Sequence, residues 1–240
     1  MSDRTAIVTG GGKRVGDAIV RALLEDGWAV IAHVHHDNDS VAPGATKVVA
    51  DLAQPDCAGL IFAAAAGVRI GLLVNNAARF AFDALGSADG AECEAHMAVN
   101  TRAPMLLVDE LARGHPGGEA LVVNLLDAKL AAPNPDFLSY TLSKYALAGL
   151  TEVAARALAS RGIRVNAIAP ALMLPSGDQD QSNFAQVHEL NPLRRGVEVD
   201  DVVRALRFLI DSTAMTGQTL LIDGGQQYMG LQRDVQFLGE

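Results

Sequence analysis

Short apolar runs alternate with longer amphipathic stretches along most of this chain. The apolar runs that predict strands cover residues 5–9, 28–34, 46–51, 70–76, 119–126, 163–170 and 219–223. The stretches between them predict helices over residues 14–26, 55–66, 92–113, 137–160 and 199–211. Because the strands do not alternate strictly between apolar and polar residues, we expect a parallel sheet that is covered by helices on both faces. The predicted fold class is therefore α/β.

The regular pattern weakens in two segments, residues 34–45 and 172–192. No change of composition and no Pro-, Gly- or Ser-rich linker divides the chain, so we expect one domain over residues 1–240. The second segment follows the carboxyl end of a predicted strand, where open α/β sheets bind their ligands. We expect a mobile lid over a substrate there, with a plain surface loop as the alternative.

The composition indicates which binding partners and which cellular compartment to expect for this protein. Half of the residues are hydrophobic and 20% are charged, so a chain of 240 residues can bury a substantial core. A formal net charge of -9 disfavours nucleic acid and anionic membranes as partners. Cys57 and Cys93 form no paired motif, which fits a reducing, cytoplasmic location. The chain starts without a signal-peptide pattern, and no apolar run reaches ~18 residues, so we expect no membrane span.

A glycine-rich loop, TGGGKRVG at residues 9–16, joins the first predicted strand to the first predicted helix. Gly10 and Gly12 allow a tight turn and a close approach of the backbone to a ligand, and Gly16 allows the helix to lie near the sheet. The N-terminus of that helix points free N–H groups toward a phosphate. The loop is one residue longer than the strict G-x-G-x-x-G pattern, and an ordinary glycine-rich turn is the alternative. Its position between strand and helix favours a nucleotide site.

Charged residues near this loop indicate which nucleotide it takes. Lys13 and Arg14 add positive charge where phosphates would lie. Proteins that prefer NAD often carry an acid at the end of the second strand to hold the ribose hydroxyls. In this chain that place holds His33, His35 and His36. His36 could donate to a 2′-phosphate, so we expect NADP, although Asp37 and Asp39 favour NAD unless they point elsewhere. No distant cysteine or histidine completes a metal shell, so no metal site is expected.

Three ionisable residues carry the candidate chemistry. Tyr140 and Lys144 are four residues apart on a predicted helix, so their side chains share one face. The pKa of a tyrosine, about 10, is too high for efficient acid or base catalysis at neutral pH, and a nearby ammonium lowers it. Asp127 ends the apolar run VVNLLD, an unusual place for a carboxyl. We expect these three side chains to form one site for proton transfer.

Six motifs resemble those of the short-chain dehydrogenase/reductase family, in the same order and spacing over nearly the whole chain. They are TGGGKRVG (9–16), NNAA (75–78), VNTRAP with Asn100, YTLSK (140–144), RVNAIAP (164–170) and IDGG (222–225). The resemblance implies a single Rossmann-type domain with a seven-stranded parallel sheet. It also implies that the chain is a cytoplasmic oxidoreductase with a nicotinamide cofactor.

The resemblance further implies a role for each matching residue. Asn100 would hold a water in a proton relay that runs through Lys144, and Asp51 would lie beside the adenine. Lys144 would also bind the nicotinamide ribose and lower the pKa of Tyr140. The full set of implied cofactor contacts is Gly10, Gly12, Lys13, Arg14, Val15, His33, His35, His36, Asp51, Leu52, Asn76, Ala77, Ala78, Tyr140, Lys144 and Pro170.

The residue at position 127 distinguishes one branch of this family. Most members have Ser where this chain has Asp127, whereas the pteridine reductases and the similar dihydromonapterin and dihydrofolate reductases have Asp. That branch also resembles this chain at TGGGKRVG, at HVHH and at Phe80, whose counterpart stacks on the pterin. The resemblance therefore implies that NADPH reduces a pterin-like C=N bond. The implied substrate contacts are Arg14, Phe80, Asp127, Tyr140 and Leu172.

Several other interpretations stay open. Asp127 could cap the following turn or pair with Lys129, and Phe80 could be an ordinary packing residue. A carbonyl or 3-oxoacyl thioester reductase is the alternative enzyme, and a regulatory nucleotide-binding protein without turnover is the alternative outside that class. The predicted helices 92–113 and 137–160 carry more apolar positions than one sheet face needs, which favours a homotetramer, with a dimer as the alternative.

Overall fold

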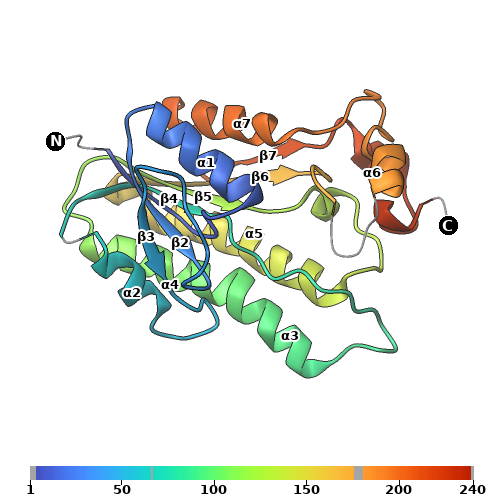
Figure 1. Cartoon of the computed structure of the whole chain (residues 1–240), viewed down its shortest axis with the longest axis horizontal. Helices are drawn as coiled ribbons and strands as arrows, with labels where there is room; N and C mark the ends of the chain where they lie inside the picture. The colour runs from blue at the N-terminus through green and yellow to red at the C-terminus, as the bar shows by residue number, and fades with distance from the viewer. Residues whose placement is uncertain (1–3, 66, 176–180, 239–240) are drawn as a thin grey trace.

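A parallel sheet of seven strands forms the centre of the molecule. The computed structural model describes residues 4–65, 67–175 and 181–238, with the strands in the order β3-β2-β1-β4-β5-β6-β7 (Figure 1). The strands are β1 (Thr5–Val8), β2 (Ala29–Val34), β3 (Thr46–Val49), β4 (Ile70–Asn75), β5 (Ala120–Leu125), β6 (Ile163–Pro170) and β7 (Thr219–Ile222). Every neighbouring pair runs parallel. The predicted α/β fold with a seven-stranded parallel sheet is confirmed.

Helices cover both faces of this sheet. Figure 1 shows α1 and α7 side by side on one face, while α2, α4 and α5 lie across the other. The helices are α1 (Arg14–Glu25), α2 (Cys57–Ala63), α3 (Gly90–Met97), α4 (Ala103–Gly114), α5 (Leu138–Leu158), α6 (Gln181–His188) and α7 (Val199–Asp211). None of them, within the described ranges, combines the length and apolar character of a membrane crossing. The strand order reverses between β1 and β4, and sheets of this kind bind ligands in the crevice at that point.

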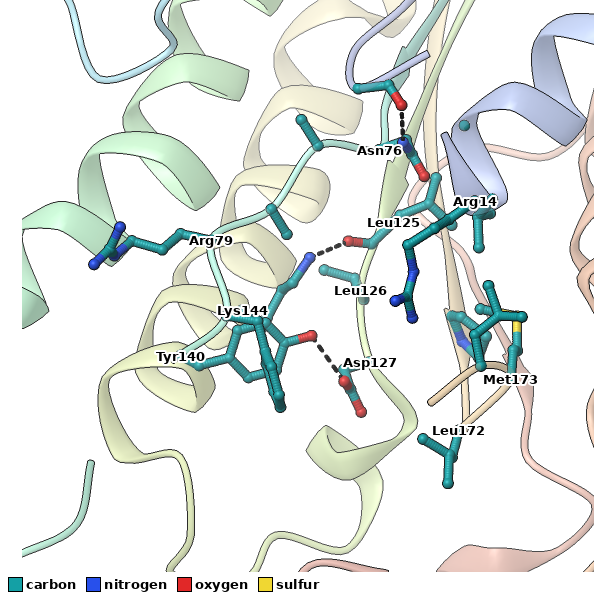
Figure 2. A pocket seen from close by; sticks show the side chains of 18 of the residues that line it. Arg14, Asn76, Arg79, Leu125, Leu126, Asp127, Tyr140, Lys144, Leu172 and Met173 are labelled. Carbon is teal, nitrogen blue, oxygen red and sulfur yellow. Dashed lines mark hydrogen bonds between the residues drawn. The ribbon is translucent and has the colours of Figure 1, made fainter. Parts of the chain in front are cut away.

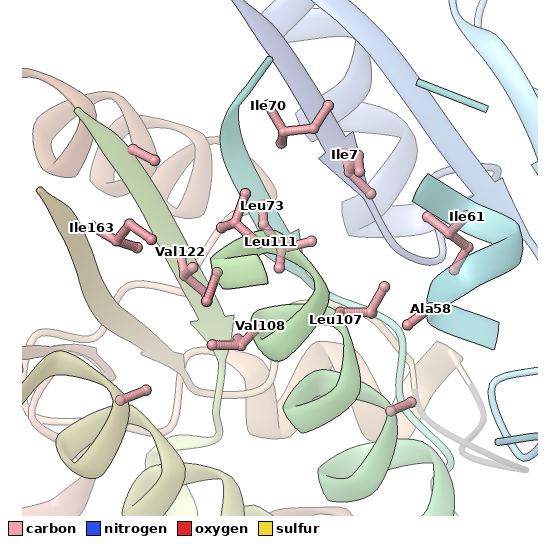
Figure 3. Close-up of a cluster of buried hydrophobic side chains, with 14 of the residues drawn as sticks. Ile7, Ala58, Ile61, Ile70, Leu73, Leu107, Val108, Leu111, Val122 and Ile163 are labelled. Atoms are coloured by element: carbon pink, nitrogen blue, oxygen red, sulfur yellow. The ribbon is translucent and has the colours of Figure 1, made fainter. Parts of the chain in front are cut away.

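Apolar clusters on the two faces hold these layers together. Between the sheet and the helices α2 and α4, Ile7, Leu73 and Val122 pack with Ile61 and Leu107, and all five are fully buried (Figure 3). A second cluster fills the space between the sheet and the helices α1 and α7. On the strands β1, β4, β5 and β6, side chains that point to either face are therefore nearly all buried, which explains the apolar runs without alternation.

The predicted helix over residues 92–113 differs from the structure. It begins at Gly90, and a π-helical turn, η1 (Ala98–Arg102), separates α3 from α4. Asn100 lies in this turn with 1% of its surface exposed, and its side chain hydrogen-bonds to neighbouring segments. These bonds compensate for the irregular backbone, because a π-turn disturbs the regular ladder of helical hydrogen bonds. A periodicity argument does not detect such a turn.

The segment 172–192 contains a helix that the sequence did not predict. Helix α6 occupies residues 181–188, so the expectation of irregular structure throughout this segment was wrong. The helix is short and polar, with Val187 as its buried residue, and its periodic signal is therefore weak. Residues 176–180 of the predicted lid lie outside the described residues.

Candidate active site

A cavity of about 700 Å³ opens at the carboxyl ends of the strands. All the residues predicted to contact cofactor or substrate line this cavity, and Asn100 is the one predicted site residue outside its lining in the described part of the chain. Strands β1, β2, β4, β5 and β6 each end at its wall. The parallel sheet therefore brings together predicted residues as far apart in the sequence as Gly10 and Leu172.

The glycine-rich loop folds tightly at the start of this cavity. Gly10 has a positive φ of 64°, a backbone conformation that side chains with a Cβ rarely adopt. At Gly16, an added Cβ would collide with the carbonyl oxygen of Gly10, so the first turn of α1 packs directly on the loop. The sequence analysis expected Gly16 to allow contact between helix and sheet, whereas the structure shows contact between helix and loop.

Two cationic residues, Lys13 and Arg14, lie at the start of α1 beside the loop. Lys13 is the N-cap residue of α1 and, within the described part of the chain, gives this helix no side-chain cap. The N–H groups of the first turn therefore remain available to an anion. Arg14 has a φ of 53°, and its Nη2 donates to the carbonyl oxygen of Pro175 at 2.9 Å. Figure 2 shows the Arg14 side chain extending toward the wall formed by Met173, away from the helix axis.

The three histidines predicted to contact the cofactor occupy different environments. His33 has 2% of its surface exposed, its Nδ1 accepts a hydrogen bond from the N–H of Gly10 at 3.2 Å, and its Nε2 donates to the carbonyl oxygen of Ala50 at 3.0 Å. Burial lowers the pKa of His33, so the ring stays neutral and can accept from Gly10. His33 therefore holds the glycine-rich loop in place at the cavity wall, with both ring nitrogens bonded within the protein.

His35 and His36 are exposed at the cavity rim, with their rings in an edge-to-face contact at 4.1 Å. Asp39 turns its carboxylate to the backbone N–H of His36 at 3.0 Å, and Asp37 accepts from Lys47 at 3.3 Å. Asp39 is thus bonded within its own loop, although it also lines the cavity, and Asp37 is bonded to Lys47 on β3.

Hydrogen bonds from Asn76 and Ala77 connect the glycine-rich loop to the centre of the sheet. Asn76 donates from Nδ2 to the carbonyl oxygen of Thr9 at 2.8 Å, and its backbone N–H donates to Thr9 Oγ1 at 3.0 Å (Figure 2). The backbone N–H of Ala77 donates to the same hydroxyl at 3.1 Å. At another part of the cavity wall, Asp51 accepts from the backbone N–H of Ala53 at 2.9 Å, and this bond lowers the pKa of Asp51.

The phenol, the carboxyl and the ammonium meet where the sequence analysis expected them. The Tyr140 hydroxyl donates to Asp127 Oδ2 at 2.8 Å, and Lys144 Nζ donates to the carbonyl oxygen of Leu125 at 2.6 Å (Figure 2). Helix α5 supplies the first and third residues, and the end of β5 supplies Asp127. The α5 terminus is fixed by Asp83, which accepts from the backbone N–H of Ser139 at 2.9 Å.

Burial decides the proton affinities in this group. The pKa of Lys144 falls to about 8 because burial disfavours its charged form. Burial also raises the pKa of Asp127, and burial together with the neighbouring Asp127 charge raises the pKa of Tyr140 well above 10. The expectation that Lys144 lowers the pKa of Tyr140 is therefore wrong for this arrangement. Burial thus favours the neutral forms of both Tyr140 and Asp127.

Asp127 also caps the turn that follows it. Its Oδ1 accepts from the backbone N–H of Lys129 at 2.8 Å, at the start of the short turn η2 (Ala128–Ala131). The capping alternative is therefore correct, and it coexists with the Tyr140 contact because the carboxyl uses a different oxygen for each. The Lys129 ammonium instead pairs with Asp234 at 3.2 Å.

The Asn100 side chain makes three hydrogen bonds within the protein. Its Oδ1 accepts from the backbone N–H of Arg79 at 2.7 Å, and its Nδ2 donates to the Arg79 carbonyl oxygen at 3.0 Å and to Ser143 Oγ at 2.9 Å. The amide therefore ties the π-turn to the cavity rim and to α5. A relay water held by the Asn100 side chain, one form of the predicted role, would have to compete with these three bonds.

The predicted substrate platform is partly exposed. Phe80 is 39% exposed, with its ring stacked on Phe137 at 4.3 Å and edge-to-face with Tyr140 at 4.7 Å. The packing interpretation accounts for one side of the ring, while the residue also lines the cavity. Leu172 and Met173 form an apolar wall elsewhere in the same space (Figure 2).

The sequence analysis missed the end of the chain. Residues 230–238, here called the C-terminal segment, follow β7, and Asp234, Val235 and Gln236 line the cavity. Lys129 also lines it. A usable signal existed, because the segment leaves β7 at the same sheet edge as the other site loops. It was overlooked because the segment lacks a periodic pattern and a family motif.

Comparisons with known proteins agree with this geometry. A family model described as enoyl-(acyl carrier protein) reductase matches residues 12–227. The chain is 33% identical to an L-xylulose reductase of Bos taurus, covering 94% of this chain and 97% of the relative. It is 27% identical to a dihydromonapterin reductase of Enterobacter sp. (strain 638), covering 93% and 96%. A solved structure of FolM alternative dihydrofolate reductase 1 from Brucella suis in complex with NADP is similar with a TM-score of 0.87 and 36% identity, covering 95% and 97%.

Proposed function

The chain is an oxidoreductase of the short-chain dehydrogenase/reductase family, and from that premise we propose that it uses NADPH to reduce a C=N bond of a pterin-like ring. The observation that carries the proposal is the 2.8 Å hydrogen bond between Tyr140 and Asp127 in the cavity. A carbonyl substrate needs one proton donor at its oxygen, whereas a nitrogen heterocycle also offers ring N–H groups that a carboxyl can bind. The dihydromonapterin reductase and the FolM dihydrofolate reductases among the similar proteins support this substrate class.

The residues around the glycine-rich loop fit a nicotinamide dinucleotide. Gly16 leaves the loop close to the first turn of α1, whose N–H groups can bind the pyrophosphate. Lys13, His35 and His36 supply the donors for a 2′-phosphate at the rim. We assign the adenine to the wall with Asp51 and the nicotinamide to the wall near Lys144. The NADP in two similar FolM structures supports NADPH as the cofactor.

The chemistry divides between the cofactor and the chain. When bound, the nicotinamide supplies the hydride. The protein supplies the proton that the reduced ring nitrogen needs, through Tyr140 and Asp127. Tyr140 gives its hydroxyl proton to the nitrogen and takes one from Asp127, so the C=N bond gains one hydride and one proton. Lys144 holds the nicotinamide ribose, and its ammonium balances charge beside the tyrosine.

The remaining predicted residues orient the substrate. Phe80 offers an exposed ring face against which a flat heterocycle can stack, and Leu172 closes the apolar side. Arg14 reaches the segment after β6 and can bind a polar substituent of the ring. Because the Asn100 side chain is bonded within the fold, we assign the relay water to its backbone carbonyl.

Replacing Asp127 tests the proposal. Asp127→Ser should lower kcat/KM for a dihydropterin by about 10²–10⁴-fold, the usual contribution of a positioned proton donor. The dissociation constant of NADPH, measured by fluorescence, should change little because Asp127 lies outside the glycine-rich loop. Equal dihydropterin turnover by the two proteins would contradict the role of Asp127.

A carbonyl reductase is the second candidate, supported by the similarity to L-xylulose reductase. The two candidates separate when NADPH oxidation at 340 nm is followed with dihydrobiopterin, a sugar ketone and an acetoacetyl thioester. Turnover of the ketone or thioester alone, undiminished in Asp127→Ser, would favour the carbonyl reductase. Tight NADPH binding without turnover of any of them would favour a regulatory protein.

We propose that a single catalytic domain spans residues 1–240 and works in the cytoplasm as a homotetramer. The exposed apolar side chains Leu142, Tyr145 and Val153 follow one face of α5, and Met105 is exposed on α4. These surfaces are candidates for contacts between subunits, because contiguous exposed apolar patches are uncommon on monomers. A dimer through the same helices is the alternative.

A further inference from the structure

Residues 79–83, here called the platform segment, carry Phe80 past the cavity without regular secondary structure. All five residues are described in the structure, and none of them belongs to a helix or a strand. The ring of Phe80 nevertheless has a defined place, stacked on Phe137 at 4.3 Å and edge-to-face with Tyr140 at 4.7 Å. Because no regular ladder of hydrogen bonds holds this backbone, side chains from other elements must hold it.

The backbone before Phe80 is held by the π-turn and by α3. The N–H of Arg79 donates to Asn100 Oδ1 at 2.7 Å, and the Arg79 carbonyl oxygen accepts from Asn100 Nδ2 at 3.0 Å. The Arg79 side chain extends away from Tyr140 (Figure 2), and its guanidinium donates to the Glu92 carboxylate at 2.6 and 2.7 Å. Arg79 is therefore fixed through both its backbone and its side chain.

The backbone after Phe80 is held by His96. This residue lies on α3 with none of its surface exposed, and its Nε2 accepts from the backbone N–H of Ala81 at 3.3 Å. Its Nδ1 donates to the carbonyl oxygen of Glu92 at 2.9 Å and lies 3.1 Å from Glu92 Oε1. A neutral imidazole has one donor and one acceptor nitrogen. The bond to Glu92 therefore places the proton on Nδ1 and leaves Nε2 as the acceptor for Ala81.

We propose that His96 is a positioning residue for the substrate: by holding Ala81, it fixes the ring of Phe80 where a flat heterocycle stacks. In the described part of the chain, His96 is not among the residues that line the cavity, so it acts through Phe80 and not by contact with the substrate. An apolar side chain could fill the same buried space without the cost of burying two polar nitrogens. The distinct contribution of the imidazole is the acceptor that it presents to Ala81. This inference rests on the proposed function.

Two amide substitutions test the role of that acceptor. His96→Gln places an oxygen near the position of Nε2, whereas the shorter side chain of His96→Asn places its amide near Nδ1 and ends before Ala81. His96→Asn should raise the KM for dihydrobiopterin about 5- to 10-fold, the usual contribution of stacking on an aromatic ring, with a smaller effect on kcat. His96→Gln should restore most of the loss. The dissociation constant of NADPH, measured by fluorescence, should stay unchanged in both variants.

Control variants separate positioning from a general loosening of α3. Asp89 caps the start of this helix by accepting from the backbone N–H of Ala91 at 3.0 Å, so Asp89→Ala weakens the helix but should leave the KM in place. In a Phe80→Ala background, His96→Asn should change the KM little further, because effects that pass through one contact are not additive. Thermal unfolding checks that each variant is folded. His96→Leu, which fills the buried space without an acceptor, replaces His96→Asn if that variant is unfolded.

Hydrogen exchange provides a readout that needs no turnover. The Ala81 amide should exchange faster in His96→Asn than in wild type, His96→Gln or Asp89→Ala. An unchanged KM in His96→Asn, or an equal increase in Asp89→Ala, would overturn the inference. If the wild type reduces no pterin but exchange is faster in His96→Asn alone, the proposed function fails while the hold of His96 on Ala81 stands. If pterins are reduced but neither KM nor exchange changes, the His96 assignment alone fails.

Discussion

Single residues in this cavity show how strongly position determines chemical character. Asp51 and Asp127 are both aspartates on its wall, yet backbone hydrogen bonding lowers the pKa of the first and burial raises the pKa of the second. The same principle separates His33, which is buried and structural, from His36, which is exposed at the rim. Residue type limits the possible chemistry, and burial and partners select which form occurs.

Lys144 predicts a pH dependence of stability in the cofactor-free protein. Its folded pKa is about 8, below the ordinary lysine value of 10.5. The folded form therefore binds fewer protons between these values, so the free energy of unfolding should rise with pH across this window and be lower below it. The change should be at most about 3–4 kcal/mol, since 10.5 and about 8 differ by about 2.5 pKa units and each unit corresponds to 1.36 kcal/mol. Urea unfolding at pH 7.5 and pH 10 should show the rise in wild type and not in Lys144→Met. The same rise in both proteins would contradict the pKa.

His33 predicts a cofactor effect that does not depend on the 2′-phosphate. His33→Phe keeps a ring but cannot accept from the Gly10 N–H or donate to the Ala50 carbonyl oxygen. Leaving such buried groups unpaired costs about 1–3 kcal/mol, so binding of NADPH and NADH should weaken alike, by roughly tenfold. His36→Phe is the matched control and should weaken NADPH binding alone. Fluorescence titration measures the dissociation constants of both cofactors. A change in the preference for NADPH over NADH in His33→Phe would contradict this role of His33.

At the scale of secondary-structure elements, the site depends on irregular pieces. The π-turn η1 places Asn100 against Arg79 and α5. At the short turn η2, Asp127 accepts from the backbone N–H of Lys129, while the Lys129 ammonium pairs with Asp234. The C-terminal segment places Asp234 in the wall of the same cavity. Regular helices and strands build the frame, while turns at the carboxyl edge of the sheet aim the functional side chains.

Asn100→Ala should measure how much the π-turn depends on this side chain. The substitution removes three hydrogen bonds and leaves the Arg79 backbone groups and Ser143 without this partner. The free energy of unfolding should fall by about 2–4 kcal/mol. Thr101→Ala, which removes one bond from the same turn to α5, should lower it by only about 1 kcal/mol. Urea unfolding ranks the two, and a stable Asn100→Ala protein would exclude this structural role.

At the scale of the whole molecule, the exposed apolar face of α5 bears on how copies of the chain associate. Val153 is 68% exposed on the α5 face that also carries Leu142 and Tyr145. The negative net charge of the chain opposes self-association, whereas burial of this apolar face favours it. The proposed tetramer would bury this apolar face. Because α5 also carries Tyr140 and Lys144, assembly would stabilise the helix that holds the active site.

Val153→Glu tests this arrangement. A charge at this position should prevent burial of the α5 face and reduce the assembly to dimers or monomers, as measured by size-exclusion chromatography with light scattering. Leu60→Glu is the matched control, since Leu60 is 50% exposed on α2 and lies outside the proposed interface. If Val153→Glu and wild type have the same mass, α5 does not form the interface.

Much of the frame could be predicted because it is encoded locally. Apolar runs predicted the strands, and the spacing of Gly10 and Gly16 predicted the glycine-rich loop. The four-residue spacing of Tyr140 and Lys144 predicted that both lie on one helix face. The contact between Asp127 and Tyr140 was also predicted, since the carboxyl edge of a parallel sheet collects such residues. The strands and the shared helix face follow from backbone periodicity, which a sequence displays directly.

By itself, the sequence determined the α/β sheet, the position of the glycine-rich loop and the set of residues available for proton transfer. Only the tertiary structure decided that His33 supports the loop, that Tyr140 holds its proton more tightly than a free tyrosine, and that Asp234 reaches the cavity wall from a distant segment. The reason is physical. Periodicity is a property of neighbouring residues, whereas burial and the charge at a given point depend on every segment that the fold brings there.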